Sequence, residues 1–454
     1  MTRRVPATWR RAPTCDNHGD GLGSTVTAEL IDDLQWRDLI ADSTDLDRLR
    51  DRMAQGPITY YCGFDPTAPS LHLGNLVQIL TMRRLQLAGH RPLALVGGAT
   101  GLIGDPKETG ERTLNDPAVV AEWTGRIEAQ LRRFLDFDGP AAAQMVNNLD
   151  WISQLDTIEF LRDIGKHFSV NRMLDREAVA ARLAGGGISY TEFSYQVLQS
   201  YDFLQLFRDH NCELQTGGSD QWGNLTAGTD LIRRITGEHA HALTTPLLVK
   251  ADGQKFGKTE TGTVWLDSDR TSPYAFYQFW INADDRDVVR WLKVFSFKSR
   301  AEIEELAAAT AERPGAREAQ RALAEEMTTL VHGAEATAAV QAASAALFGR
   351  GELVDSDPAT LAAALAEAPG YTVTAEDLGD TGAVPFVQLF AKTGLVKGTG
   401  AARRTINEGG AYLNNERVSD IDREVGAADL LHGRWLVLRR GRKSMAGVDA
   451  SALN

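Results

Sequence analysis

From residue 58 to about residue 250, short apolar runs alternate with stretches whose apolar residues recur at helical spacing. The runs ITYYCGF (58–64) and RPLALVGG (91–98) predict buried strands, whereas residues 73–87 and 118–137 predict helices. Strand–helix units that repeat favour a doubly wound, Rossmann-like parallel sheet, because parallel strands need helical crossovers. We expect ligands to bind on the loops at the carboxyl ends of these strands.

The pattern changes twice after this region. Residues 272–348 are almost wholly helical in pattern, with a break at Pro314. Residues 349–382 are acidic and rich in Gly and Pro, which is typical of a linker, and they predict one short helix at 358–366. The last 70 or so residues predict a small α+β module, with helices at 386–395 and 400–410 and strands at 411–415 and 434–444. We therefore predict an N-terminal extension (1–26), a Rossmann-like domain (27–250), a helical domain that begins with the segment KFGKT (251–348), a linker (349–382) and a C-terminal module (383–454).

Residues 1–25 are rich in Arg and then in Gly, without the apolar core of a secretory signal, and predict a disordered extension. Helical spacing begins near Thr27, so Val26 is a second candidate for the first residue of the native protein. No apolar run of about 18 residues predicts a membrane span. The three cysteines, Cys15, Cys62 and Cys212, are isolated, which indicates a reducing cytoplasm and no metal site.

Charge is distributed unevenly along the chain. The formal net charge is −13, which argues against a protein that coats nucleic acid nonspecifically. Residues 383–454 contain 11 Lys and Arg against 7 Asp and Glu, a balance of +4, so the remainder carries −17. The C-terminal module is therefore the expected place for RNA.

The segment YCGFDPTAPSLHLGN (61–75) joins a predicted strand to a predicted helix. The strand ends at Gly63, a proline-containing turn follows, and the helix begins near His72. Backbone N–H groups and the positive end of the helix dipole at such a helix start favour a phosphate group. His72 and Asn75 can both donate hydrogen bonds to a nucleotide, and Gly74 leaves room for a close approach.

A second segment, KFGKT (255–259), follows an apolar stretch and an ADGQ turn. Its two lysines, Lys255 and Lys258, lie on a glycine-containing loop that could close over a triphosphate. A third segment, FSYQVLQSYDFLQLF (193–207), predicts a helix with Tyr195, Gln199 and Asp202 on one face. This polar face is poor in Lys, Arg and Glu, which indicates a face turned toward a site rather than toward solvent.

These segments, with LVGGATGLIGDP (95–106) and LQTGGSDQWGN (214–224), occur in an order that resembles the tyrosyl branch of the class I aminoacyl-tRNA synthetases. HLGN is similar to the HIGH signature of that class and KFGKT to its KMSKS loop. The resemblance extends from about residue 30 to the C terminus. It implies activation of L-tyrosine by ATP, with Mg²⁺ supplied with the nucleotide, transfer of tyrosine to tRNA(Tyr), and a cytoplasmic homodimer.

The resemblance also implies roles for individual residues. The catalytic residues would be Thr67, His72, Asn75, Lys255, Lys258 and Thr259. Tyrosine would be bound by Tyr61, Asp105, Tyr195, Gln199, Asp202 and Gln221. ATP would be bound by Cys62, Gly63, Asp65, Thr67, His72, Gly74, Asn75, Gly218, Asp220 and Lys258. RNA would be bound by Arg403, Arg404, Arg439, Arg440, Arg442 and Lys443.

Tyrosine would be held at both of its polar ends. Asp105, Tyr195 and Gln199, with Gln221 beside them, would receive its ammonium group. Tyr61 and Asp202 would bracket the phenol hydroxyl.

The sequence departs from the family pattern at three places. Asn75 stands where the signature often has His, and it can donate a hydrogen bond but cannot carry charge. Gly257 stands where KMSKS has Ser. The DPKETGER loop is one residue shorter than the similar family loop, which leaves the expected contribution of Lys107 and Arg112 to the phosphate site open.

Three other readings remain open from the sequence alone. The first is a tryptophanyl-tRNA synthetase, against which the pair Tyr61 and Asp202 argues. The second is a smaller adenylyltransferase, against which the helical domain and the basic C-terminal module argue. The third is an inactive relative that serves as an RNA-binding scaffold, against which His72 and the two lysines of KFGKT argue.

Overall fold

The computed structural model describes residues 22–106, 114–259, 262–347, 351–378, 382–441 and 444–453. The chain divides into two compact units. The first contains residues 1–267 and 284–311, and the second contains residues 268–283 and 312–454. The expected helical domain at 251–348 is thus split, since part of it belongs to each unit.

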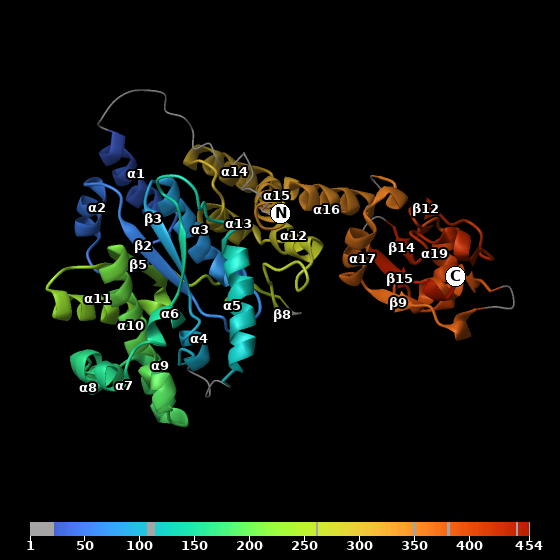
Figure 1. The fold of residues 1–454 in the computed structure, drawn as a ribbon. Helices are drawn as coiled ribbons and strands as arrows, with labels where there is room; N and C mark the ends of the chain where they lie inside the picture. The colour runs from blue at the N-terminus through green and yellow to red at the C-terminus, as the bar shows by residue number, and fades with distance from the viewer. Residues whose placement is uncertain are drawn as a thin grey trace. The chain divides into compact units, whose positions relative to one another are not determined.

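The first unit is built on a six-stranded sheet in the order β1-β6-β5-β2-β3-β4 (Figure 1). Its strands are β1 (Asp42–Ser43), β2 (Thr59–Phe64), β3 (Arg91–Val96), β4 (Gln144–Asn147), β5 (Cys212–Gly218) and β6 (His241–Thr245). Neighbouring strands are parallel except for β1, which pairs with β6 in antiparallel fashion. The predicted doubly wound sheet is confirmed, with an antiparallel strand added at one edge.

The strand order creates a switch point beside β2. The chain goes from β2 to β3 on one side and later adds β5 on the other, so Tyr61 lies between Leu93 and Gln215. Ligands bind in doubly wound sheets at the carboxyl ends of the strands next to such a reversal. The ends of β2 and β5 are therefore the expected place for the site.

The first unit also contains a set of helices. They are α1 (Leu22–Trp36), α2 (Leu46–Ala54), α3 (Leu73–Leu87), α4 (Thr100–Ile103), α5 (Pro117–Leu131), α6 (Leu149–Ile152), α7 (Thr157–Glu159), α8 (Val170–Leu174), α9 (Glu177–Gly185), α10 (Tyr190–His210), α11 (Trp222–Thr236), α13 (Asp285–Phe295) and α14 (Arg300–Glu312). Of these helices, α3, α5, α10 and α11 pack against the sheet. The predicted range of α3 is confirmed, and α1 begins five residues before the helical spacing is evident. The long helix α10 begins after the cap Ser189 and ends at Asn211, whose φ of 50° lies in the left-handed region.

The second unit combines helices with a small sheet. Its helices are α12 (Pro273–Ile281), α15 (Glu318–His332), α16 (Ala334–Leu347), α17 (Pro358–Ala366), α18 (Phe386–Lys392) and α19 (Thr399–Asn407). Its larger sheet has the order β12-β11-β14-β15-β9, formed by β9 (Gly370–Thr372), β11 (Ala411–Leu413), β12 (Glu416–Arg417), β14 (Trp435–Arg440) and β15 (Ser444–Asp449). A separate pair joins β10 (Val384–Pro385) to β13 (Glu424–Val425).

The predicted linker at 349–382 is more structured than its composition indicates. The short helix α17 lies at the predicted position, but β9 pairs in parallel with β15, and Val373 packs in the core of the C-terminal module. The boundary expected at residue 383 therefore divides residues that share one sheet. In the part of the chain that the structure describes, no helix has the length and apolar character needed to cross a membrane.

Candidate active site

The start of α3 is organised by His72 and Asn75. The Gly74 N–H donates to Nδ1 of His72 at 3.0 Å, and the His72 N–H donates to Oδ1 of Asn75 at 3.0 Å. This reciprocal cap satisfies two of the backbone donors at the helix start. A Cβ on Gly74 would lie 2.8 Å from the imidazole ring, so the glycine is required by the cap itself.

The cap also fixes how His72 can act. Because Nδ1 accepts a hydrogen bond, a neutral imidazole carries its proton on Nε2 and can donate it to a ligand. Burial lowers the pKa of His72, and the nearby Lys258 lowers it further. His72 is therefore a neutral donor at physiological pH, and the positive charge at this end of the site must come from other groups.

KFGKT lies between two small hairpins. Phe256 donates its N–H to the carbonyl of Leu248, whereas β7 (Lys258–Thr259) pairs with β8 (Gly262–Thr263). The side chains of Lys255 and Lys258 are exposed, and Nζ of Lys258 donates to the Thr263 hydroxyl. The two lysines thus share one surface loop as predicted, and the proximity of Lys258 to His72 brings KFGKT and HLGN together.

A network of short hydrogen bonds surrounds Asp65 at the end of β2. Its carboxylate accepts from the Tyr195 hydroxyl at 2.6 Å and from Thr100 at 2.7 Å. A Cβ on Gly97 would lie 2.0 Å from Asp65, which explains the glycine at this position. Tyr195 therefore contacts Asp65, which the sequence assigned to ATP. Because its hydroxyl donates to Asp65, its oxygen lone pairs remain available to accept from an ammonium group.

Asp105 is held by residues that follow β5. Its carboxylate accepts from Gln221 at 2.9 Å and from Asn224 at 3.4 Å, and Asn224 also donates to Gln221 at 2.9 Å. Gln221 precedes α11, and Asn224 lies in its first turn. Asp105 and Gln221 thus lie together in a polar group whose carboxylate could bind a cation.

The pair Tyr61 and Asp202 lies deep in the first unit, and both side chains are buried. Asp202 accepts from Nε1 of Trp151 at 2.8 Å and from Nδ2 of Asn148 at 3.0 Å. Burial raises the pKa of Asp202 to about 7, although these two donors oppose the shift. The Tyr61 hydroxyl is buried and has no hydrogen-bond partner among the residues that the structure describes.

Several residues of the site have no place in the sequence predictions. Asn148 and Trp151 hold Asp202, and Asn148 also donates to Thr100 and accepts from the Ala99 N–H. The indole N–H of Trp151 donates to Asp202 from α6. The NNLDW segment carries no signal that would single out these two residues, because their contacts to Asp202 span more than 50 positions.

An apolar side chain flanks the nucleotide end of the site. Leu247 follows β6 and is 59% exposed, and its Cδ2 lies 3.6 Å from the position that a Cβ of Gly218 would take. Asp220 and Thr67, two of the predicted ATP residues, are also exposed near strand ends. Cys62 is buried, and burial raises the pKa of its thiol to about 12, so it remains protonated. Gly63 follows it in β2, one residue before the strand ends at Phe64.

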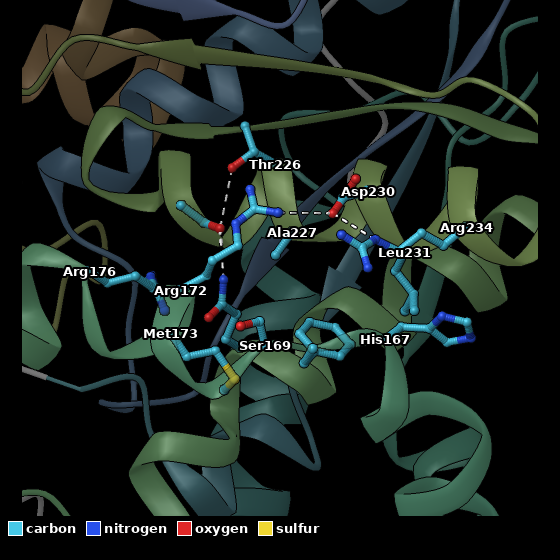
Figure 2. A pocket seen from close by; sticks show the side chains of 13 residues that line it. His167, Ser169, Arg172, Met173, Arg176, Thr226, Ala227, Asp230, Leu231 and Arg234 are labelled. Atoms are coloured by element: carbon cyan, nitrogen blue, oxygen red, sulfur yellow. Dashed lines mark hydrogen bonds and ion pairs between the residues drawn. The ribbon is translucent and has the colours of Figure 1, made fainter.

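A basic pocket of about 190 Å³ lies next to α10 and α11 (Figure 2). Figure 2 shows Arg172, Arg176 and Arg234 around it, and Arg172 lies 3.5 Å from Asp230. Burial lowers the pKa of Arg176, an effect that the nearby Asp105 opposes. Arg176, which lines the pocket, therefore places positive charge near the Asp105 carboxylate.

The predicted RNA-binding residues differ in exposure. Arg403 and Arg404 on α19 and Arg440 at the end of β14 are exposed. Arg439 is only 8% exposed and its guanidinium lies 5.1 Å from the ring centre of Tyr412, so it contributes to packing more than to the surface. Arg442, Lys443, Lys107 and Arg112 lie outside the described residues, as does the side chain of Thr259. No group of three or more metal-ligating side chains is present in the described ranges.

Comparison with known proteins agrees with this geometry. Residues 53–349 match the family described as tRNA synthetases class I (W and Y), and residues 362–447 match the tyrosine–tRNA ligase SYY-like C-terminal domain. The chain therefore belongs to the class I tRNA synthetases of this group. It is 64% identical over 425 residues to a tyrosine–tRNA ligase of Streptomyces avermitilis, covering 93% of this chain and 99% of the relative.

Two further relatives support the same assignment. A tyrosine–tRNA ligase of Thermobifida fusca is 60% identical over 432 residues, covering 92% of this chain and 99% of the relative. The structure of a C-terminally truncated mitochondrial tyrosyl-tRNA synthetase of Aspergillus nidulans is 29% identical with a TM-score of 0.63, covering 70% of this chain and 97% of that one. The activity of the chain is that of a tyrosine–tRNA ligase, which uses ATP, and the tryptophanyl, adenylyltransferase and scaffold readings are set aside.

Proposed function

We propose that Tyr61 and Asp202 select tyrosine by binding its phenol hydroxyl. The observation that carries this proposal is the buried Tyr61 hydroxyl, which has no hydrogen-bond partner among the described residues. The pKa of Tyr61 is raised mainly by burial and also by the negative charge of the nearby Asp202. A buried hydroxyl without a partner costs free energy. A phenol that donates to Asp202 and accepts from Tyr61 removes that cost, whereas phenylalanine makes neither hydrogen bond and leaves the Tyr61 hydroxyl unpaired.

At the other end of the amino acid, the ammonium group would lie between Asp105 and Tyr195, with Gln199 and Gln221 beside it. Asp105 supplies negative charge, and the Tyr195 oxygen can accept because its proton is directed to Asp65. Fixing both ends of the substrate orients its carboxylate toward the ends of β2 and β5. This orientation converts the reaction with bound ATP into an intramolecular step.

Activation would proceed by attack of the tyrosine carboxylate on the α-phosphorus of ATP. The new carboxylate–phosphorus bond forms as the bond to the leaving pyrophosphate breaks, giving tyrosyl-adenylate. The carboxylate is already ionised near neutral pH, so no general base is needed. Catalysis would then depend on stabilising charge on the phosphates by Nε2–H of His72, Thr67, Asn75 and the lysines of KFGKT.

The remaining nucleotide groups would be distributed around the strand ends. Cys62, Asp220 and Asn75 would contact the ribose, and Gly63, Gly74 and Gly218 would allow the nucleotide to approach the backbone. The exposed side chain of Leu247 offers an apolar face for the adenine ring. Mg²⁺ would arrive bound to ATP as part of the substrate.

Amino-acid-dependent ATP–pyrophosphate exchange tests this assignment. We expect exchange with tyrosine and none above background with tryptophan or phenylalanine. Tyr61→Phe should keep the ring packed against Phe203, 5.2 Å away between centroids, while it removes the hydroxyl. This variant should therefore reduce the preference for tyrosine over phenylalanine; an unchanged preference would exclude Tyr61 from recognition.

For the second step, tRNA(Tyr) would bind through its phosphates to Arg403, Arg404 and Arg440 and to the basic pocket at Arg172. Guanidinium groups supply the phosphate-dependent part of such binding, which falls as salt rises. In the aminoacylation assay, the double variant Arg403→Gln/Arg404→Gln should therefore have a lower affinity for tRNA. Its tyrosine-dependent ATP–pyrophosphate exchange should be unchanged. Equal loss in both assays would argue for a defect in folding rather than in RNA binding.

A homodimer is supported by apolar side chains exposed in residues 149–190. Ile158 is 64% and Tyr190 is 69% exposed, and Leu161 and Val170 are also exposed. Exposed apolar groups that gather in one segment favour a protein contact. The double variant Ile158→Asp/Tyr190→Asp should sediment as a monomer. Val354→Asp, which changes an exposed valine outside this segment, should leave the dimer intact.

We also place the protein in the cytoplasm, because Cys62 and Cys212 are buried free thiols.

A further inference from the structure

The KFGKT loop is held at its base by α13. The residues before it form a tight turn in which Gly253 donates its N–H to the carbonyl of Lys250, and Lys250 donates to Gln254. At the tip of this turn, the Ala251 N–H donates to both carboxylate oxygens of Asp287, each at 3.0 Å. Asp287 is only 6% exposed and lies in the first turn of α13.

The loop has a second contact with the same helix. Phe256, the second residue of KFGKT, is buried and packs against Trp291 and Phe295 of α13, with ring centroids 5.1 Å apart in both cases. Lys255 and Lys258 are exposed on either side of Phe256 and Gly257. The two lysines are thus carried by a segment that is fixed to α13 at Ala251 and at Phe256.

On its other side the loop contacts α3. A Cβ on Gly257 would lie 3.2 Å from Leu73, the first residue of α3, and the φ of Gly257 is +75°. Leu73 donates its N–H to the carbonyl of Val264, and Leu266 donates to the carbonyl of Leu71. The chain that follows KFGKT is therefore joined to the HLGN segment by backbone hydrogen bonds.

The two helices are in turn joined to each other. Arg84 in the last turn of α3 is buried and donates to the carbonyls of Val294 and Ser296 at the end of α13, at 3.0 and 2.7 Å. Arg37 donates to the Ser296 carbonyl as well, at 3.1 Å. Positive side chains at a helix C-terminus are favourable, so these contacts fix α13 against α3 (Figure 1).

We propose that Asp287 is a positioning residue for adenylate formation, which acts through the Ala251 turn to hold Lys255 and Lys258 over the ATP phosphates. The proposal rests on the function proposed above, and it adds α13 to the catalytic apparatus without any contact to substrate. Its physical basis is that charged groups accelerate phosphoryl chemistry only when they are held at the correct distance. A displacement of about 1 Å can reduce the rate by about 100-fold.

Two variants remove the contact from opposite sides. Asp287→Ala removes the acceptor, whereas Ala251→Pro removes the donor at the second position of a turn, where proline is well tolerated. We expect each to lower kcat/KM for ATP in pyrophosphate exchange by about 10- to 100-fold, with the Kd for tyrosine within twofold of the wild type. Asp287→Asn keeps one acceptor oxygen and should lie within about threefold of the wild type.

Asp284→Ala is the matched control on the same helix. Asp284 caps α13 by accepting from the Arg286 N–H and has no hydrogen bond to the described residues of the loop, so its removal should weaken the helix and leave kcat/KM for ATP within twofold. In addition, Asp287→Ala should have little further effect in a Lys255→Met/Lys258→Met background, because its effect passes through these two lysines. Additive losses would overturn the proposal, and so would wild-type kcat/KM in folded Asp287→Ala and Ala251→Pro.

Hydrogen exchange separates this proposal from the function on which it rests. The backbone amide hydrogens of residues 255–258 should exchange with solvent faster in Asp287→Ala than in Asp284→Ala. This expectation holds whether or not the protein has tyrosine-dependent ATP–pyrophosphate exchange activity. Equal exchange in the two variants would show that Asp287 does not hold the loop. Absence of tyrosine-dependent activity in the wild type would instead remove the proposed roles of the site residues.

Discussion

At the end of the site that would take the phenol, the polar groups are buried and held by neighbours, whereas at the nucleotide end the lysines of KFGKT are exposed on a loop. Asp202 is 2% exposed and receives two hydrogen bonds, from Asn148 and Trp151. Lys255 and Lys258 are exposed and depend on a segment fixed at its base. The difference suggests that selection of the amino acid depends on a preformed interior and that catalysis depends on placing surface charges.

The largest expected effect tests the buried end. Asp202→Ala removes the acceptor for the phenol, and it takes from the Trp151 indole and the Asn148 amide the carboxylate to which both donate. We expect kcat/KM for tyrosine to fall by roughly 100- to 1,000-fold, or about 3–4 kcal/mol, because a hydrogen bond to a charged group is lost and buried donors are left unpaired. The KM for ATP should change less than threefold. Pyrophosphate exchange over tyrosine and ATP titrations measures both; an unchanged specificity constant for tyrosine would remove Asp202 from recognition.

The next effect tests the exposed end. Lys258→Met keeps the length of the side chain but removes its charge, and it should lower kcat for adenylate formation by about 100-fold, the typical loss for one donor to a developing anion. The Kd for tyrosine, measured by equilibrium dialysis, should stay within twofold. Lys258→Arg, which keeps the charge, should recover part of the rate. A loss of tyrosine binding in Lys258→Met would show that the two ends of the site are not separate.

Features that depend on neighbouring residues in the sequence could be predicted, whereas features that depend on contacts between distant residues could not. The strands β2 and β3 and the helix α3 were predicted because apolar runs and helical spacing are local signals. The strands β4, β9 and β15 were missed, since β4 and β9 are short and only partly buried and β15 is a small-residue segment without clear alternation. Such strands form because a neighbouring strand is present, which local periodicity does not reveal.

For the site, the residues within motifs could be named from the sequence, but their partners could not. The pairing of Tyr195 with Asp65 joins positions 130 apart, and it depends on the order of the strands. In the same way, Asn148 and Trp151 approach Asp202 only after β4 has paired with β3. Asp287 could not be singled out either. It is one of several aspartates at the start of α13, and its contact is to Ala251, in a turn 36 residues earlier.

A smaller effect is expected from the donors around Asp202. Trp151→Phe keeps the aromatic ring but removes the hydrogen bond to the carboxylate, so kcat/KM for tyrosine should fall by about tenfold, in line with a hydrogen bond to a charged group. Since this hydrogen bond lowers the pKa of Asp202, its loss should raise that pKa above about 7. Exchange assays at several pH values would detect both changes, and wild-type behaviour would show that Trp151 serves only packing.

The pH dependence of tyrosine binding gives a related test. The phenol can donate to Asp202 only when the carboxylate is ionised, and the pKa of Asp202 is about 7 before tyrosine binds. Binding therefore favours loss of the proton, and the affinity for tyrosine should weaken by about tenfold from pH 8 to pH 6. Asp202→Asn should bind tyrosine more weakly at all pH values and without this dependence. A wild-type Kd that is constant over this range would contradict an ionised acceptor.

The smallest effect concerns the apolar part of the nucleotide end. Leu247→Ala removes an exposed side chain next to Gly218, where the adenine ring of ATP would cover it. Burying part of a leucine contributes about 1 kcal/mol, so the KM for ATP should rise by roughly three- to fivefold with kcat unchanged. Leu87→Ala, another exposed leucine at the far end of α3, is the matched control and should leave the KM for ATP unchanged. Because Leu247 supplies binding area and no charge, a fall in kcat instead of a rise in KM would show that the exposed end is organised by packing as well as by its lysines.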